Sequence, residues 1–333
     1  MQRSRQAIAL TLFLVLTAPP ALAAVPPAET LLADIGYSAN DIASIKAGKI
    51  VTGKATGANE RDLAAAFAFL VKVSPAELIK DLKAGLLSDN EPDTIAGGSF
   101  NGAGSVDDLA KLVLNPDPAK RVKQYVGARG GSDLNLSTAE IAAFNKLGSS
   151  AAVPAVEAQV HSALMERLTA YQKSGLDGIA AYDRGKGTSR AVGDELKTYL
   201  SAMKALQKYA PAAYTAMTQY PNAKPAGTAE NFRWMHFSAH DVPTVALVHG
   251  MAVPDGDAFI MLQRQFYVSE GYNCTQAVAG FLPVQGGTIV LYANHTSTDQ
   301  VAGFGGSVKR SIGSSMMSSQ LKDLFTKIQT QAK

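Results

Sequence analysis

The sequence predicts an α+β protein, in which an antiparallel β-meander packs on a long C-terminal helix and a helical region occupies the middle of the chain. After about residue 228, segments of alternating polarity are separated by turn residues, which is typical of antiparallel strands. From Val308 to Ile328, apolar residues recur mostly at intervals of three and four and indicate an amphipathic helix. The sheet needs a cover, so we expect a buried helix stripe of Val308, Ile312, Met316, Leu321, Leu324, Phe325 and Ile328.

The chain divides into four segments by composition and pattern. We expect a signal peptide over 1–23, an N-terminal α/β region over 24–137, a helical region over 138–227, and the meander with its amphipathic helix over 228–333. The mature length of about 310 residues allows one large domain or two ordinary ones. The first and last mature regions can therefore also form one domain.

The first residues have the three parts of an export signal. Arg3 and Arg5 supply positive charge, 7–16 is an apolar stretch too short to span a bilayer, and 21–23 has the small residues at which signal peptidase cleaves. These features predict a periplasmic or secreted protein. Elsewhere, no stretch reaches the roughly 18 apolar residues of a membrane helix, so we expect a soluble mature chain without a membrane span.

Composition excludes several classes of protein. The formal net charge of +3 includes Arg3 and Arg5, so the mature chain is almost neutral and lacks the basic footprint of a nucleic-acid binder. A hydrophobic content of 47% is that of a folded protein. Cys274 is the single cysteine, which excludes an intramolecular disulfide and predicts a buried, inert thiol. No cofactor is expected.

The region 24–137 mixes helices and strands. Ser38 is placed as a helix N-cap with Asp41 completing a capping box, and Ser74 caps another helix that opens with a proline. The segment 63–73 is ambiguous, because its alanines favour a helix whereas its phenylalanines alternate as in a strand. We expect helices over 27–36, 38–47 and 74–86, a short strand over 49–53, and a strand with loops within 88–105.

The remaining regions are more regular. The expected helices are 138–146, 153–174, 193–209 and 212–220, with the loop 183–187 between two of them. The expected strands are 231–238, 244–253, 258–268 and 288–294. The segment 276–282 is expected to be a further strand or a turn of helix. In the first of these strands, Phe232, Trp234 and His236 share one face.

Several motifs resemble a family of exported proteobacterial proteins. They are QFYV at 265–268, GYN at 271–273, LPV at 282–284, GLDGI at 175–179, and above all DQVAGFGG at 299–306 with KRSIG at 309–313. This resemblance covers most of the mature chain and implies export without a particular activity. The order of helices, strands and a long last helix is also similar to the START-like helix-grip fold, whose members enclose lipids or other apolar ligands.

Histidines and a glycine-rich loop are the candidate chemical groups. His236 and His240 are four residues apart on one face, but neither a carboxylate nor a third histidine completes a metal site, so we expect none. His249 is expected to be a core residue. The glycines of 303–307 can present backbone N–H groups to an anion, although a tight turn is the favoured interpretation. The alternative is that Asp299 and Arg310 form an ion pair across this turn.

We expect a non-catalytic exported protein that binds an apolar or lipid-like small molecule between its sheet and its last helix. The order of meander and helix, the aromatic-rich strands and the lack of a complete set of catalytic residues favour this function. Two alternatives stay open: a periplasmic hydrolase or metal-dependent enzyme that uses His236 and His240, and an envelope accessory or structural protein that acts through a protein partner. The expected ligand-binding residues are Trp234, His236, Tyr267, Tyr292, Asp299, Arg310 and Met316.

Overall fold

The computed structural model describes residues 26–84, 86, 94–239, 241–303 and 305–332. The expected signal peptide, residues 88–93 of the expected strand-and-loop segment, and His240 lie outside this range. Export and a periplasmic or secreted location therefore stay predictions.

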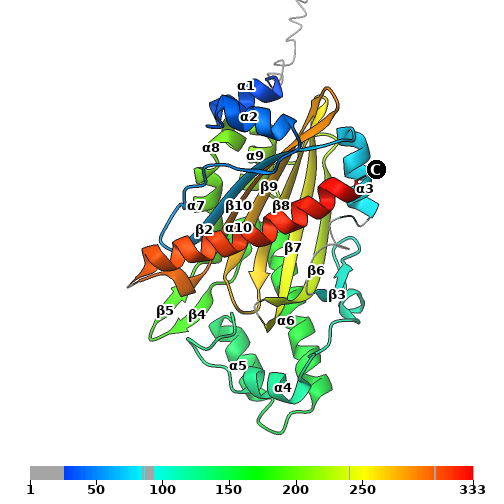
Figure 1. Cartoon of the computed structure of the whole chain (residues 1–333). Helices are drawn as coiled ribbons and strands as arrows, with labels where there is room; N and C mark the ends of the chain where they lie inside the picture. Colours follow the sequence, from blue (N-terminus) through cyan, green and yellow to red (C-terminus); the bar gives the residue numbers. More distant parts are fainter. Residues whose placement is uncertain (1–25, 85, 87–93, 240, 304, 333) are drawn as a thin grey trace, which may run out of the picture.

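Eight antiparallel strands form one large sheet, which confirms the α+β class (Figure 1). Their spatial order is β1-β2-β10-β9-β8-β7-β6-β3, so the meander from β6 to β10 is flanked by strands of the N-terminal region. The regions 24–137 and 228–333 thus share a sheet. The strands are β1 Val51–Thr52, β2 Asp62–Val71, β3 Thr94–Ser99, β6 Ala229–Ala239, β7 Val242–Asp255, β8 Ala258–Val268, β9 Cys274–Val284 and β10 Gly287–Ser297.

The long helix α10 (Gly306–Gln331) crosses one face of this sheet (Figure 1). Its buried Phe325 packs against the rings of Phe67, Phe69 and Tyr292, with centroids 5.5, 5.0 and 4.8 Å away. Further contacts come from partly buried side chains of α10, which are Met317, Leu321 and Leu324. The expected packing of the last helix on the sheet is therefore confirmed.

The expected apolar stripe of α10 is wrong in its first half. Val308, Ile312 and Met316 are 63%, 58% and 51% exposed. Steps of four residues keep these three side chains close to one line, but the five-residue step from Met316 to Leu321 turns the direction by about 140°. The helix therefore has two apolar lines, and the sheet covers the second one.

The middle region covers the opposite face of the sheet. There, Leu247, Leu262 and Phe266 of β7 and β8 share a core with Leu164 and Leu168 of the longest helix of this layer. The helices of the middle region are α5 Thr138–Lys146, α6 Val153–Ser174, α7 Val192–Ala202, α8 Lys204–Tyr209 and α9 Pro211–Thr218, and α4 (Pro118–Val126) of the N-terminal region packs against α5 and α6. A hairpin of β4 (Tyr182–Gly185) and β5 (Thr188–Arg190) belongs to the same region.

Smaller elements complete the fold. Helices α1 (Ala28–Asp34) and α2 (Ala39–Lys46) pack near Leu282 and Ile289 of the sheet, and α3 (Pro75–Ala84) lies beside the end of α10 (Figure 1). Short 3-10 turns are η2 Val106–Leu109, η3 Gly175–Gly178 and η4 Asp299–Val301. None of the described helices has both the length and the apolar character needed to cross a membrane.

Local expectations have mixed outcomes. The bounds of α5, α6 and β8 are as expected, and the capping box of α2 is confirmed, since Ser38 Oγ accepts a hydrogen bond from the Asp41 N–H at 3.2 Å. Residues 63–71 of the ambiguous segment 63–73 belong to strand β2. In contrast, the helix expected over 193–209 breaks at Met203, and helix α4 was not expected. The expected loop 183–187 contains most of strand β4 and the turn of a hairpin.

Candidate functional site

The structure does not bring the seven expected ligand-binding residues together. Trp234, His236 and Tyr267 are buried on the face of the sheet that the middle helices cover, opposite α10. Tyr292 lies on the other face, beneath α10. Asp299 follows the end of β10, whereas Arg310 and Met316 are on α10, the latter pointing outward.

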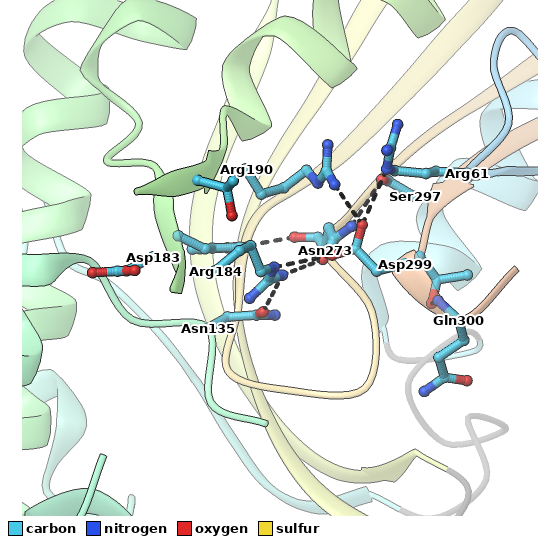
Figure 2. Close-up of polar contacts among 12 residues, drawn as sticks. Arg61, Asn135, Asp183, Arg184, Arg190, Asn273, Ser297, Asp299 and Gln300 are labelled. Atoms are coloured by element: carbon cyan, nitrogen blue, oxygen red, sulfur yellow. Dashed lines mark hydrogen bonds and ion pairs between the residues drawn. The ribbon is translucent and has the colours of Figure 1, made fainter. Parts of the chain in front are cut away.

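Asp299 is the centre of an ion-pair cluster that joins separate parts of the chain (Figure 2). Its carboxylate accepts from Arg61 Nε at 3.1 Å, from Arg184 Nε at 3.0 Å and from an Arg190 terminal nitrogen at 2.8 Å. Arg61 precedes β2, while the other two arginines belong to the β4–β5 hairpin. Burial alone would raise the pKa of Asp299, but Arg190 and Arg184 hold it below its ordinary value.

The arginines of this cluster have other partners as well, which are Glu60 for Arg61, Glu195 for Arg190, and the side-chain oxygens of Asn135 and Asn273 for Arg184. Three guanidinium groups thus face three carboxylates, and little positive charge remains to attract an anion. We interpret the cluster as a clamp that holds the hairpin on the end of the sheet.

The expected ion pair between Asp299 and Arg310 is wrong. Arg310 donates instead to the backbone carbonyl oxygen of Glu60 at 2.8 Å. It thereby ties the first turns of α10 to the segment before β2. The preceding glycines act as a turn, since Gly303 and Gly305 have φ values of +74° and +71°, which other residues rarely adopt.

His236 borders a small cavity on the face of the sheet opposite α10. The lining includes Leu112, Arg121, Tyr125, His161, His236 and Val245. The cavity offers about 10 Å³ to the centre of a water molecule, which is room for one water and too little for a lipid-like ligand. Burial, and then the charge of Arg121, lowers the pKa of His236 to about 4, so its ring is neutral near pH 7. Its Nδ1 has no hydrogen-bond partner within the described part of the chain.

His249 belongs to a closed polar network. Its Nδ1 lies 2.9 Å from the hydroxyl of Tyr171, and its Nε2 lies 2.9 Å from a carboxylate oxygen of Glu230. Arg264 donates to the same tyrosine hydroxyl at 2.9 Å. A carboxylate, an imidazole and a hydroxyl in series resemble a catalytic triad. However, Tyr171, His249 and Arg264 are all 0% exposed, so a substrate has no access to the hydroxyl.

Metal binding by histidines has no support in the described residues. Within them, no three His, Cys, Asp or Glu side chains are grouped so that they could hold a metal ion. His240, which the enzyme alternative requires, lies outside the described range. His236 is buried beneath the helical layer rather than in an open cleft.

The sheet face beneath α10 has a different character. Toward this face, β9 presents small side chains between larger ones of its neighbours. Ala279 lies between Tyr292 and Met261, and Ala277 lies between Asn294 of β10 and a glutamine of β8. At these two positions the short alanines fill less of the space above the sheet than their neighbours on β8 and β10 do, whereas Phe281 of β9 packs in the core beneath α10. We call Met261, Ala277, Ala279, Tyr292 and Asn294 the β9 site.

Asn294 is the least satisfied polar residue of the β9 site. It is 6% exposed, and its Oδ1 has no hydrogen-bond partner among the residues that the structure describes. Within the described part of the chain, its Nδ2 reaches Thr296 Oγ1 at 3.4 Å and the Met317 sulfur at 3.5 Å. A buried amide without good partners costs about 1–3 kcal/mol. A hydrogen-bonding group brought by a ligand would recover this energy.

Two other polar groups with an unpaired atom are better satisfied. Asp62 has one oxygen without a partner among the described residues, but its second oxygen accepts from His295 Nδ1 and from the Ala58 N–H, both at 2.6 Å. The Nε of Arg190 is likewise unpaired within this part of the chain, whereas its terminal nitrogens bind carboxylates. Sequence reasoning missed Asn294. The alternation of β10 places it on the same face as Tyr292, and this is the signal that could have found it.

Compared with models of protein families, with curated proteins and with solved structures, the chain has no match.

Proposed function

We propose that the protein is a non-catalytic binding protein for an apolar or lipid-like small molecule that carries a hydrogen-bonding group. The ligand lies at the β9 site, between α10 and the sheet. The single observation that carries this proposal is the buried, poorly paired amide of Asn294 in an interface whose other side chains are mostly apolar. Sites for small molecules are typically apolar, with a few polar groups that orient the ligand.

The side chains around Asn294 fit the apolar part of such a ligand. Met261, Ala279 and Tyr292 are half-buried rather than closed off, and Met317 of α10 lies directly above Asn294. Methionine is flexible and polarisable, so it adapts to ligands of irregular shape. A shift of Met317 would open the β9 site without breaking a hydrogen bond of the backbone.

The architecture also favours this function over the enzyme alternative. A long C-terminal helix across an antiparallel sheet is similar to the helix-grip organisation, whose members enclose apolar ligands. The polar clusters that resemble catalytic groups are either paired internally, as around Asp299, or inaccessible, as around His249. We therefore propose binding without chemistry, in an exported protein.

Ligand retention tests the proposal. The mature protein, purified without detergent, is examined by native mass spectrometry and titrated with a dansyl-labelled fatty acid. We expect a bound small molecule or saturable binding, which Ala279→Phe should weaken at least tenfold by filling the site. The matched control is Ala205→Phe, because Ala205 is exposed on α8. Folding of each variant is checked by its melting temperature.

A second variant addresses the polar group directly. Asn294→Leu removes the unpaired amide and should raise or preserve stability, since a buried polar group is replaced by an apolar one. It should at the same time weaken binding of the ligand's hydrogen-bonding end. The proposal is wrong if the wild-type protein neither retains nor binds an apolar molecule, or if Ala279→Phe and Ala205→Phe bind equally well.

A further inference from the structure

The outward side of α10 carries an exposed apolar line. Val308, Ile312 and Met316 are each more than half exposed and follow one another at intervals of four residues. In a helix of 3.6 residues per turn they lie within an arc of about 80° centred on Ile312. Leu321 and Leu324, which contact the sheet, point about 180° and about 120° away from Ile312. The fold therefore does not need these three side chains for its own core.

Lysines flank this apolar line. Lys309, Lys322 and Lys327 are exposed and lie within about 80° of the direction of Ile312. Asp323, the single acidic residue of α10, is also exposed, within about 20° of that direction, and the three lysines outnumber it. The outward side of the helix is thus positively charged, although the mature chain as a whole is expected to be almost neutral. We call these lysines, together with Val308, Ile312 and Met316, the outer face of α10.

The size of the outer face points away from a protein partner. A stable protein interface buries about 800 Å² on each side. Three exposed side chains supply well under half of that area, so a second copy of the chain would be held weakly. A lipid surface has no such threshold, because each apolar side chain that inserts adds its own transfer free energy and each lysine adds its own attraction to anionic head groups.

We propose that the outer face of α10 docks on an anionic lipid bilayer. In this arrangement the axis of α10 lies parallel to the membrane surface. Val308, Ile312 and Met316 enter the boundary between head groups and acyl chains, and the three lysines lie among the anionic head groups. The sheet stays on the far side of the helix, in water. This inference goes beyond the proposed ligand binding and does not rest on it, since it uses the other side of the helix.

Co-sedimentation with vesicles tests the docking surface. The mature protein is mixed with vesicles of phosphatidylcholine alone or of phosphatidylcholine with phosphatidylglycerol, at low and at high salt. We expect binding to the anionic vesicles at low salt, and much weaker binding to the neutral vesicles or at high salt. Ile312→Ser should weaken binding about tenfold, and Lys309→Ala with Lys322→Ala should weaken it about 25-fold, since each lysine contributes about fivefold.

Matched controls come from exposed residues elsewhere in the fold. Ile95→Ser removes an isoleucine that is 43% exposed on β3, and Lys173→Ala removes an exposed lysine of α6. Both should bind like the wild-type protein. The inference is overturned if the wild-type protein does not bind anionic vesicles, or if the controls lose as much binding as the outer-face variants. It is also overturned if the protein forms a dimer that Ile312→Ser dissociates, which would assign this face to a second copy.

Ligand binding and membrane docking can fail independently. Ala279→Phe leaves the outer face intact and should bind vesicles normally while losing the small ligand. Ile312→Ser should have the opposite effect. If both variants lose both activities, the two sites are not separate and the docking inference is wrong.

Discussion

Replacing His236 by leucine should remove one pH-dependent contribution to stability. In the folded protein, burial and the nearby Arg121 lower the pKa of His236 to about 4 from an ordinary value of 6.5. Below about pH 6.5 the unfolded chain binds a proton that the folded protein cannot yet bind. Stability is therefore lost as the pH falls from about 6.5 to about 4, and this loss is absent above that range.

The size of this effect follows from the two pKa values. At about pH 5, protonation of this one histidine in the unfolded chain shifts the folding equilibrium toward the unfolded state by a factor of about 30. This factor corresponds to a loss of roughly 2 kcal/mol in the free energy of unfolding. Because the cavity around His236 is lined by Leu112 and Val245, leucine is tolerated there. Leucine also removes the unpaired Nδ1, so we expect little loss of stability at about pH 7.5, or a small gain.

Urea unfolding at about pH 7.5 and pH 5 measures this prediction. Other groups titrate in both proteins, so the relevant quantity is the change of unfolding free energy with pH in the wild-type protein minus that in His236→Leu. We expect a difference of about 2 kcal/mol, with the variant less sensitive to acid. Equal pH dependence in the two proteins would show that His236 is not held neutral by its surroundings.

Two further predictions concern the contacts that hold the fold together. Phe325→Ala removes a buried ring that packs on three others and should cost about 3–5 kcal/mol in thermal unfolding, whereas Lys327→Ala, on the exposed side of α10, should cost less than about 0.5 kcal/mol. Equal melting temperatures would contradict the packing of α10. Asp299→Asn should cost about 1–2 kcal/mol, less than a fully buried pair because the carboxyl is 36% exposed. The control is Asp177→Asn, which should have almost no effect, because the Asp177 side chain is 79% exposed in its ion pair with Lys197.

The meander was predictable because its signal is local. Alternating polarity and turn residues identify antiparallel strands without knowledge of their partners. The strand β2 was harder, because both of its faces are covered. Phe67 and Phe69 face α10, while Ala64 and Ala68 face the other way, and all four are buried. A strand buried on both sides loses the alternation of polar and apolar residues, so sequence alone left it ambiguous.

The hairpin of β4 and β5 was missed for a different reason. The sequence from Gly185 to Gly187 signals a turn, and the structure has positive φ at Gly185, Lys186 and Gly187. The flanking strands are short and polar, so nothing in their pattern distinguishes them from a loop. Two arginines of this hairpin pair with Asp299, which is more than a hundred residues away. Such a long-range ion pair has no local signature.

The candidate site shows where sequence reasoning about residue types reaches its limit. Trp234 and His236 share a face, as their spacing predicts, but that face is covered by the helical layer. The side chain that carries the proposal, Asn294, attracts no notice in the sequence. Its importance comes from what surrounds it: alanines on the neighbouring strand and a methionine on α10 leave its amide poorly paired. A hydrogen-bonding deficit of this kind is a property of packing, and it arises only when segments distant in sequence come together.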